Sequence, residues 1–144
     1  MFKKILIAFD GSDPAREALR QAVDLTRADN AELHCISVEG RLPAYAATLG
    51  EVDEAKAEKD RYFSAIEREA VTYARDHGIE LHPVKVVGEP ADRIVHYAEE
   101  GGFDLIVLGE KGHSRAHRFL LGDTSDKVVD HAPCSTLVVR RPRS

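Results

Sequence analysis

Three glycines in the C-terminal third of the chain are spaced like a loop that could bind phosphate. Gly109 and Gly112 lie three residues apart, and Gly122 follows after nine further residues. Glycines allow a backbone to approach phosphate oxygens because they carry no Cβ atom. Gly122 also precedes a predicted helix, whose unpaired amide groups and dipole favour an anion. The alternative is that these glycines serve only as turn residues.

The same segment is basic, although the protein as a whole is acidic. Residues 109–118 carry a formal charge of +2, because three basic side chains oppose Glu110, whereas the whole chain carries -5. The basic and histidine side chains are Lys111, His113, Arg115, His117 and Arg118. A local positive charge favours an anionic ligand, while the net negative charge argues against nucleic acid as a partner. The alternative is an ordinary solvated loop.

A second loop lies near the N-terminus, where Asp10-Gly11-Ser12 follows an apolar run over residues 3–9. In open α/β sheets, ligands bind at the carboxyl ends of the strands, where the strand order reverses. We therefore expect this loop and the loop that begins at Gly109 to lie at the same edge of a sheet.

Other kinds of chemistry find less support. The glycine loop is neither a P-loop nor a Gly-x-Gly-x-x-Gly dinucleotide motif. His113, His117 and Asp123 could be combined into a zinc site, but the segment reads as a loop without a cysteine ligand. No nucleophile-elbow sequence supports a Ser-His-Asp triad. We assign no catalytic and no metal-binding residues.

Strand and helix patterns alternate along the chain. Strands are predicted over residues 3–9, 32–38, 79–87, 104–108 and 135–140, with helices between them, a long one over 51–77 and a loop over 40–50. Strict alternation predicts right-handed crossovers and a parallel sheet. The expected fold is α/β: one domain over residues 1–144, a doubly wound, open parallel sheet of five strands in the order 3-2-1-4-5, with helices on both faces.

Composition is that of an ordinary globular protein, with 43% hydrophobic and 31% charged residues in 144. No apolar run approaches the roughly 20 residues that span a bilayer, so we expect no membrane partner and a cytoplasmic location. Cys35 and Cys134 are expected to be reduced, buried thiols rather than a disulfide or a metal site.

Taken together, the motifs resemble those of the universal stress protein family over nearly the whole length. The similar segments are residues 4–12, 87–91, 104–109 and 122–140. In the ATP-binding branch of that family, Gly-x-x-Gly is followed by nine residues and then by Gly with Ser or Thr. Gly109, Gly112 and Gly122 match this spacing. The resemblance implies an adenine nucleotide held between the loop after the first strand and the loop from Gly109 to Gly122.

The resemblance also implies roles for particular residues. Asp10 would bond the ribose or the base, and the backbone of Val38 would meet adenine. The full set of expected nucleotide contacts is Ala8, Asp10, Ser12, Val38, Gly109, Lys111, Gly112, His113, Arg115, Gly122, Asp123, Thr124 and Ser125.

Asp123 departs from the family pattern, which has Ser or Thr at this position. A carboxylate facing phosphate oxygens would be repelled by about 1 kcal/mol or more. Asp123 could instead cap the following helix, leaving Thr124 or Ser125 to meet phosphate, or hold Mg²⁺ beside the phosphates. ATP, AMP and a cyclic nucleotide such as cyclic AMP therefore all remain candidates.

We expect a sensor or switch in the stress response rather than an enzyme, with slow ATP hydrolysis at most. In this view the nucleotide orders the loop from Gly109 to Gly122, and a protein partner reads the ordered surface. The alternative is an interaction module of the same family that binds no nucleotide. The resemblance also implies a homodimer, formed by antiparallel pairing of the last strand, Thr136–Arg140.

Overall fold

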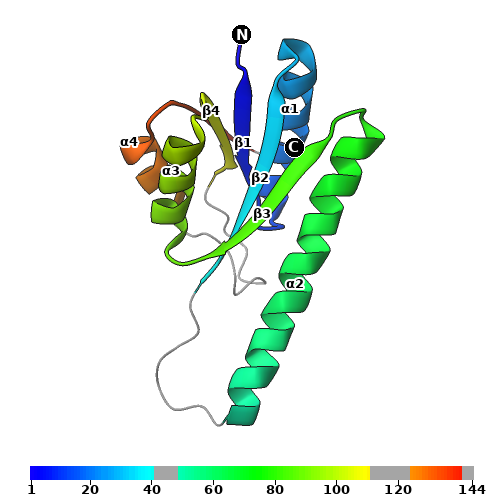
Figure 1. Cartoon of the computed structure of the whole chain (residues 1–144), viewed down its shortest axis with the longest axis vertical. Coiled ribbons are helices and arrows are strands. Elements are labelled where there is room, and N and C mark those ends of the chain that lie inside the picture. Colours follow the sequence, from blue (N-terminus) through cyan, green and yellow to red (C-terminus); the bar gives the residue numbers. More distant parts are fainter. Residues whose placement is uncertain (41–48, 111–123, 141–144) are drawn as a thin grey trace.

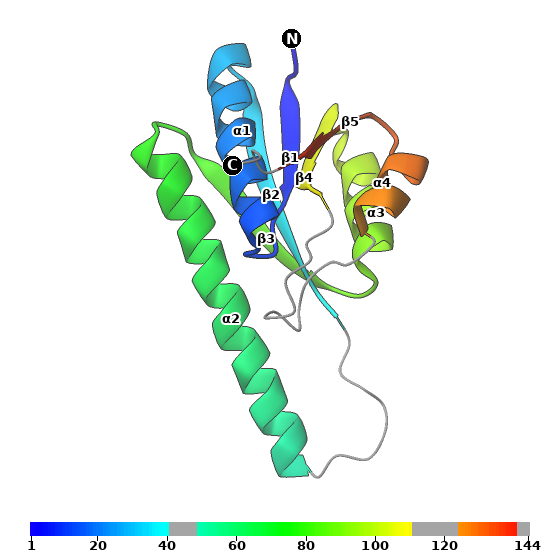
Figure 2. The same cartoon turned by 180° about the vertical axis from the view of Figure 1, so that it is seen from behind.

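The computed structural model describes residues 1–40, 49–110 and 124–140. Five parallel strands form one sheet in the order β3-β2-β1-β4-β5, as the sequence predicts (Figure 1; β5 is labelled in Figure 2). The strands are β1 (Lys4–Ala8), β2 (Glu32–Glu39), β3 (Leu81–Val87), β4 (Leu105–Gly109) and β5 (Ser135–Val139). The strand order reverses between β1 and β4, which are neighbours in the sheet.

Helices cover both faces of the sheet, which confirms the doubly wound arrangement (Figures 1 and 2). The helices are α1 (Asp13–Asp29), α2 (Leu49–Asp76), α3 (Pro90–Gly101) and α4 (Thr124–His131). On one face, Ile5 and Ile7 of β1 pack with residues of α1 and α2. On the other face, Leu6 and Ala8 pack with residues of α3 and α4. Alternate side chains of β1 thus enter two separate cores, which explains its continuous apolar run.

The ends of the long helix explain two boundaries that differ from the sequence prediction. The loop expected to reach residue 50 ends earlier, because α2 already begins at Leu49. The strand expected from Ile79 begins only at Leu81, because Ile79 belongs to the cap of α2. The amide of Ile79 donates to the carbonyl of Ala74, and Gly78 adopts a φ of 79°. This is a Schellman motif, which requires a left-handed residue after the helix.

The two outer strands are less buried than the three inner ones. In β3 only Leu81 is buried, and Pro83, which has no amide hydrogen, is tolerated on an edge strand. In β5 only Val139 is buried. The sheet therefore ends on both sides in edge strands.

Two expectations about composition can be compared with the structure. Cys35 and Cys134 form no disulfide, and Cys35 is buried, but Cys134 is only half-buried because it precedes β5 at the surface. Among the described helices, none is both long and apolar enough to cross a bilayer.

Candidate functional site

The turn after β1 is built around a buried carboxylate. Asp10 is only 6% exposed, and its Oδ1 atom accepts hydrogen bonds from the amide of Ser12 at 3.0 Å and from the Ser12 hydroxyl at 2.6 Å. The Ser12 hydroxyl oxygen in turn accepts from the amide of Ala15 at 3.2 Å, so Ser12 is the N-cap of α1. One network thus fixes the Asp10 side chain and the start of α1 together.

Gly11 and helix α2 hold this turn from the other side. Gly11 has a φ of +81°, a conformation that side chains disfavour, and an added Cβ would lie 2.7 Å from both Ile66 and the Tyr62 hydroxyl. The Tyr62 hydroxyl donates to the backbone carbonyl of Asp10. Burial and the nearby charge of Asp10 raise the pKa of Tyr62, so its hydroxyl remains a donor. The turn is consequently fixed by both α1 and α2.

The end of β2 runs past the end of β1. Ala8, the last residue of β1, pairs with Ile36, and the Ser37 hydroxyl donates to the carbonyl of Phe9 at 2.8 Å. The side chains of Ala8 and Val38 are buried in the core beneath α3, at 1% and 4% exposure. A ligand could therefore meet only the backbone at these two positions, which is the role that the resemblance implies for Val38.

Gly109 brings the end of β4 against the start of α1. A Cβ atom added to Gly109 would lie 2.5 Å from the carbonyl carbon of Pro14 and 2.8 Å from the amide nitrogen of Ala15. Real Cβ atoms do not approach backbone so closely, so only glycine fits. The ends of β1 and β4 thus converge on the first turn of α1.

Thr124 and Ser125 form the first turn of α4, and both are buried. Because α4 connects the parallel strands β4 and β5, its N-terminus points to the carboxyl edge of the sheet, as does the N-terminus of α1. Two helix N-termini at one edge favour an anion. The other predicted contacts, Lys111, Gly112, His113, Arg115, Gly122 and Asp123, lie outside the described residues.

Tyr62, which holds the turn after β1, is a residue that the sequence analysis did not single out. It lies one helical turn before Ile66, on the face of α2 that packs against the sheet. That spacing could have placed it beside the turn after β1.

The comparisons with known proteins agree with this architecture. The sequence model of the Universal stress protein family matches residues 1–140 of this chain. The chain belongs to the universal stress protein family. A universal stress protein of Methanocaldococcus jannaschii, MJ0531, is 32% identical over 99% of this chain and 85% of its own length. The structure of the universal stress protein UspA from Lactobacillus plantarum has a TM-score of 0.82 and 30% identity, covering 96% of this chain and 98% of that one.

Two similar structures of this family contain an adenine nucleotide. A universal stress protein in complex with cAMP has a TM-score of 0.72 and 28% identity, with 96% of this universal stress protein and 97% of the other chain covered. The universal stress protein from Archaeoglobus fulgidus in complex with dAMP has a TM-score of 0.63 and 25% identity, with 96% and 98% covered. These ligands belong to those proteins.

Proposed function

We propose that this universal stress protein binds an adenine nucleotide at the carboxyl edge of its sheet and acts as a sensor or switch in the stress response. The observation that carries the proposal is the turn from Asp10 to Ser12. Its buried carboxylate, held by the amide and the hydroxyl of Ser12, lies where the strand order reverses, and Tyr62 of α2 holds the backbone of the same turn. A carboxylate at this point can accept hydrogen bonds from ribose hydroxyls or from the amino group of adenine.

The start of α1 and the end of β4 supply the rest of the argument. Gly109 allows the backbone of β4 to lie against Pro14, which brings the end of β4 close to the turn after β1. The N-termini of α1 and α4 favour the phosphate end of a nucleotide. The nucleotide complexes of the two related proteins support the same ligand class.

In this proposal, the charge of Asp123 determines how many phosphate groups the bound nucleotide carries. Because a carboxylate replaces the Ser or Thr of the family pattern, AMP or cyclic AMP is favoured over ATP unless Mg²⁺ accompanies the triphosphate. Signalling would come from the segment between Gly109 and Gly122, which would present a nucleotide-dependent surface to a protein partner. We propose no catalytic cycle, and any ATP hydrolysis would be slow and incidental.

The decisive experiment is to denature freshly purified protein, separate the released small molecules on a nucleotide column, and titrate the emptied protein calorimetrically with ATP, AMP, cyclic AMP and adenosine. We expect an adenine nucleotide in the released fraction and measurable heat with at least one ligand. No released nucleotide together with no heat from any of the four would refute the proposal.

A pair of aspartate variants locates the site. Asp10→Asn removes the charge of the buried carboxylate, whereas Asp13→Asn removes the same charge from an exposed side chain in the first turn of α1. We expect the Asp10 variant to bind adenosine at least tenfold more weakly and the Asp13 variant to bind it normally. Equal effects of the two changes would place the nucleotide elsewhere.

A second candidate function is a dimeric interaction module that binds no nucleotide. The observation in its favour is the edge strand β5, where Val138 is 36% exposed. An unpaired edge strand with apolar side chains is a template for pairing with another strand. We propose that β5 pairs with its copy in a second molecule. The dimer is compatible with nucleotide binding, so the release and titration of nucleotide, and not the mass of the protein, separate the two candidate functions.

A further inference from the structure

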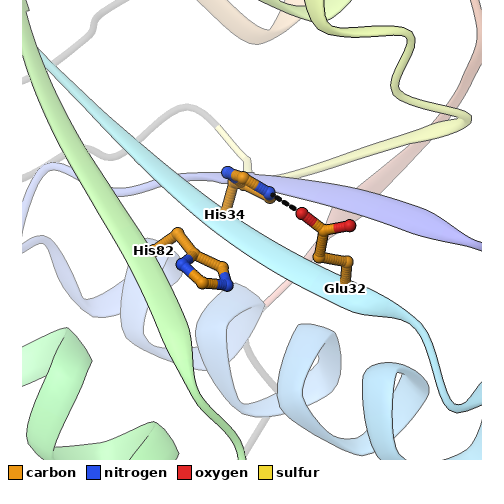
Figure 3. Close-up of side chains that lie close together, drawn as sticks. All are labelled: Glu32, His34 and His82. Atoms are coloured by element: carbon orange, nitrogen blue, oxygen red, sulfur yellow. Dashed lines mark hydrogen bonds and ion pairs between the residues drawn. The ribbon is translucent and has the colours of Figure 1, made fainter.

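Two histidines and a glutamate meet at the amino ends of β2 and β3 (Figure 3). Glu32 and His34 are two residues apart on β2, so their side chains lie on the same face of the sheet. His82 lies directly beside His34, because these residues are register partners in the parallel pairing of β2 and β3. The cluster lies at the amino ends of the strands, whereas the turn after β1 lies at their carboxyl ends. It is therefore separate from the proposed nucleotide site.

The side chains are close enough to share one ion. The His34 Nε2 atom lies 2.7 Å from the Glu32 Oε1 atom, and the rings of His34 and His82 are 4.8 Å apart between centroids. One ligand atom from each of the three residues lies within 4.8 Å of the other two. A tetrahedral zinc site with bonds of about 2.1 Å needs its ligand atoms about 3.4 Å apart. The observed separations, from 2.7 Å up to 4.8 Å at most, bracket this spacing.

The surroundings orient the central ligand and leave one side of the cluster open. The ring of Phe103 contacts His34 edge-on, with centroids 5.0 Å apart and an interplanar angle of 86°. The His34 side chain is only 17% exposed, whereas Glu32 is 53% exposed. An imidazole held by its neighbours beside two exposed ligands, Glu32 and His82, leaves room for water at the fourth position of a metal ion.

A cation of β1, Lys4, lies beside the cluster. Lys4 of β1 is the register partner of Glu32 of β2. Its ammonium group donates to the carbonyl of Gly101 at 2.6 Å and lies over the Phe103 ring at 4.7 Å, so it already has partners of its own.

We propose that Glu32, His34 and His82 bind a divalent transition-metal ion, Zn²⁺ in the first place, with water as the fourth ligand. Two imidazoles and a carboxylate are the ligand types that zinc prefers, and the same set also accepts Co²⁺ or Ni²⁺. The ion replaces the hydrogen bond between Glu32 and His34, and it joins the edge strand β3 to β2.

The test uses the full chain, freed of metal with a chelator and then dialysed. Zinc affinity is measured by competition with a chromophoric chelator, and Co²⁺ serves as a spectroscopic probe of tetrahedral coordination. We expect one equivalent of Zn²⁺ to bind and to raise the thermal midpoint, because an ion that binds only the folded state stabilises it. His82→Ala and Glu32→Gln should each weaken zinc binding at least about tenfold, since even second-shell partners contribute about that much.

Two controls keep the outcome unambiguous. His96→Ala removes an exposed histidine that pairs with Glu100 at 3.0 Å on α3, and it should leave zinc affinity unchanged. Far-UV circular dichroism confirms that each variant is folded, and His82→Gln replaces His82→Ala if the alanine variant is not. Zinc binding that survives both ligand substitutions overturns the proposal. So does binding that is lost only in a His113→Ala, His117→Ala double variant, or a wild-type chain that takes up no zinc.

Discussion

Gly109 at the end of β4 lies directly against the backbone of Pro14 in the first turn of α1. A Cβ atom at Gly109 would meet the carbonyl carbon of Pro14 at 2.5 Å and its oxygen at 2.7 Å. Backbone atoms in a helix cannot rotate away as a flexible side chain would. The contact therefore fixes the end of β4 relative to α1, the helix that follows β1.

Replacing Gly109 with alanine should lower the free energy of unfolding by about 1–3 kcal/mol, because the added methyl group overpacks this contact. Urea unfolding measures the loss. Gly40→Ala is the matched control: it follows β2, nothing lies within 4 Å of its added Cβ, and it should change stability by less than about 0.5 kcal/mol. Equal losses in the two variants would mean that the contact with Pro14 is not tight.

Replacing Asp123 with serine should strengthen the binding of ATP more than that of adenosine. The reason is that the change removes a negative charge expected beside the phosphates and restores the residue type of the family pattern. Calorimetric titration with both ligands in the absence of Mg²⁺ measures the difference. An equal change for ATP and adenosine would show that the Asp123 carboxylate does not face phosphate.

Val138→Lys should convert the proposed dimer to a monomer, because it places a charge on the exposed side of the edge strand β5. Light scattering at micromolar concentration gives the mass. Val87→Lys is the control on the opposite edge strand, β3, where the valine is 52% exposed, and it should leave the mass unchanged. A monomeric mass for the unaltered chain would contradict the dimer.

Stability should fall above pH 9 because of Cys35. Burial raises the pKa of the Cys35 thiol from about 9 to about 12. The unfolded chain therefore releases the thiol proton first, and the stability that is fully present below pH 9 is lost as the pH rises towards 12. The loss attributable to this group is about 1.4 kcal/mol for each pH unit.

Urea unfolding at pH 8, 9 and 10 tests this dependence. Cys35→Ala should be less stable at pH 8, because it leaves a small cavity, but should lose less stability than the unaltered chain between pH 9 and 10. Cys134→Ala is the comparison, since Cys134 is only half-buried and should contribute less. Parallel pH profiles for all three chains would exclude Cys35 as the cause.

Much of the fold could be predicted because single segments carry their own signals. The apolar run over residues 3–9 predicted the first strand, and the alternation of strand and helix patterns predicted the parallel sheet that the structure confirms. The start of β3 was misplaced because Ile79 is apolar like a strand residue but is used to close α2. Apolarity alone does not separate these two uses.

The candidate site could be predicted only in part. Asp10 and Ser12 were recognised from a short motif, but the role of Tyr62 depends on how α2 crosses the sheet. The cluster of Glu32, His34 and His82 depends on the register between β2 and β3. The order of the strands was predicted from the sequence, but not which residues of β2 and β3 lie beside each other, so these three side chains were not brought together.

The position of β1 in the middle of the sheet constrains the order in which the protein folds. Its partner on one side is β2, the next strand in the chain, but on the other side Ile5 pairs with Leu105, 100 residues later. Closing so long a loop costs entropy before any contact repays it. We therefore expect β1, α1 and β2 to associate early on the pathway, and the half of the sheet formed by β4 and β5 to dock onto β1 late.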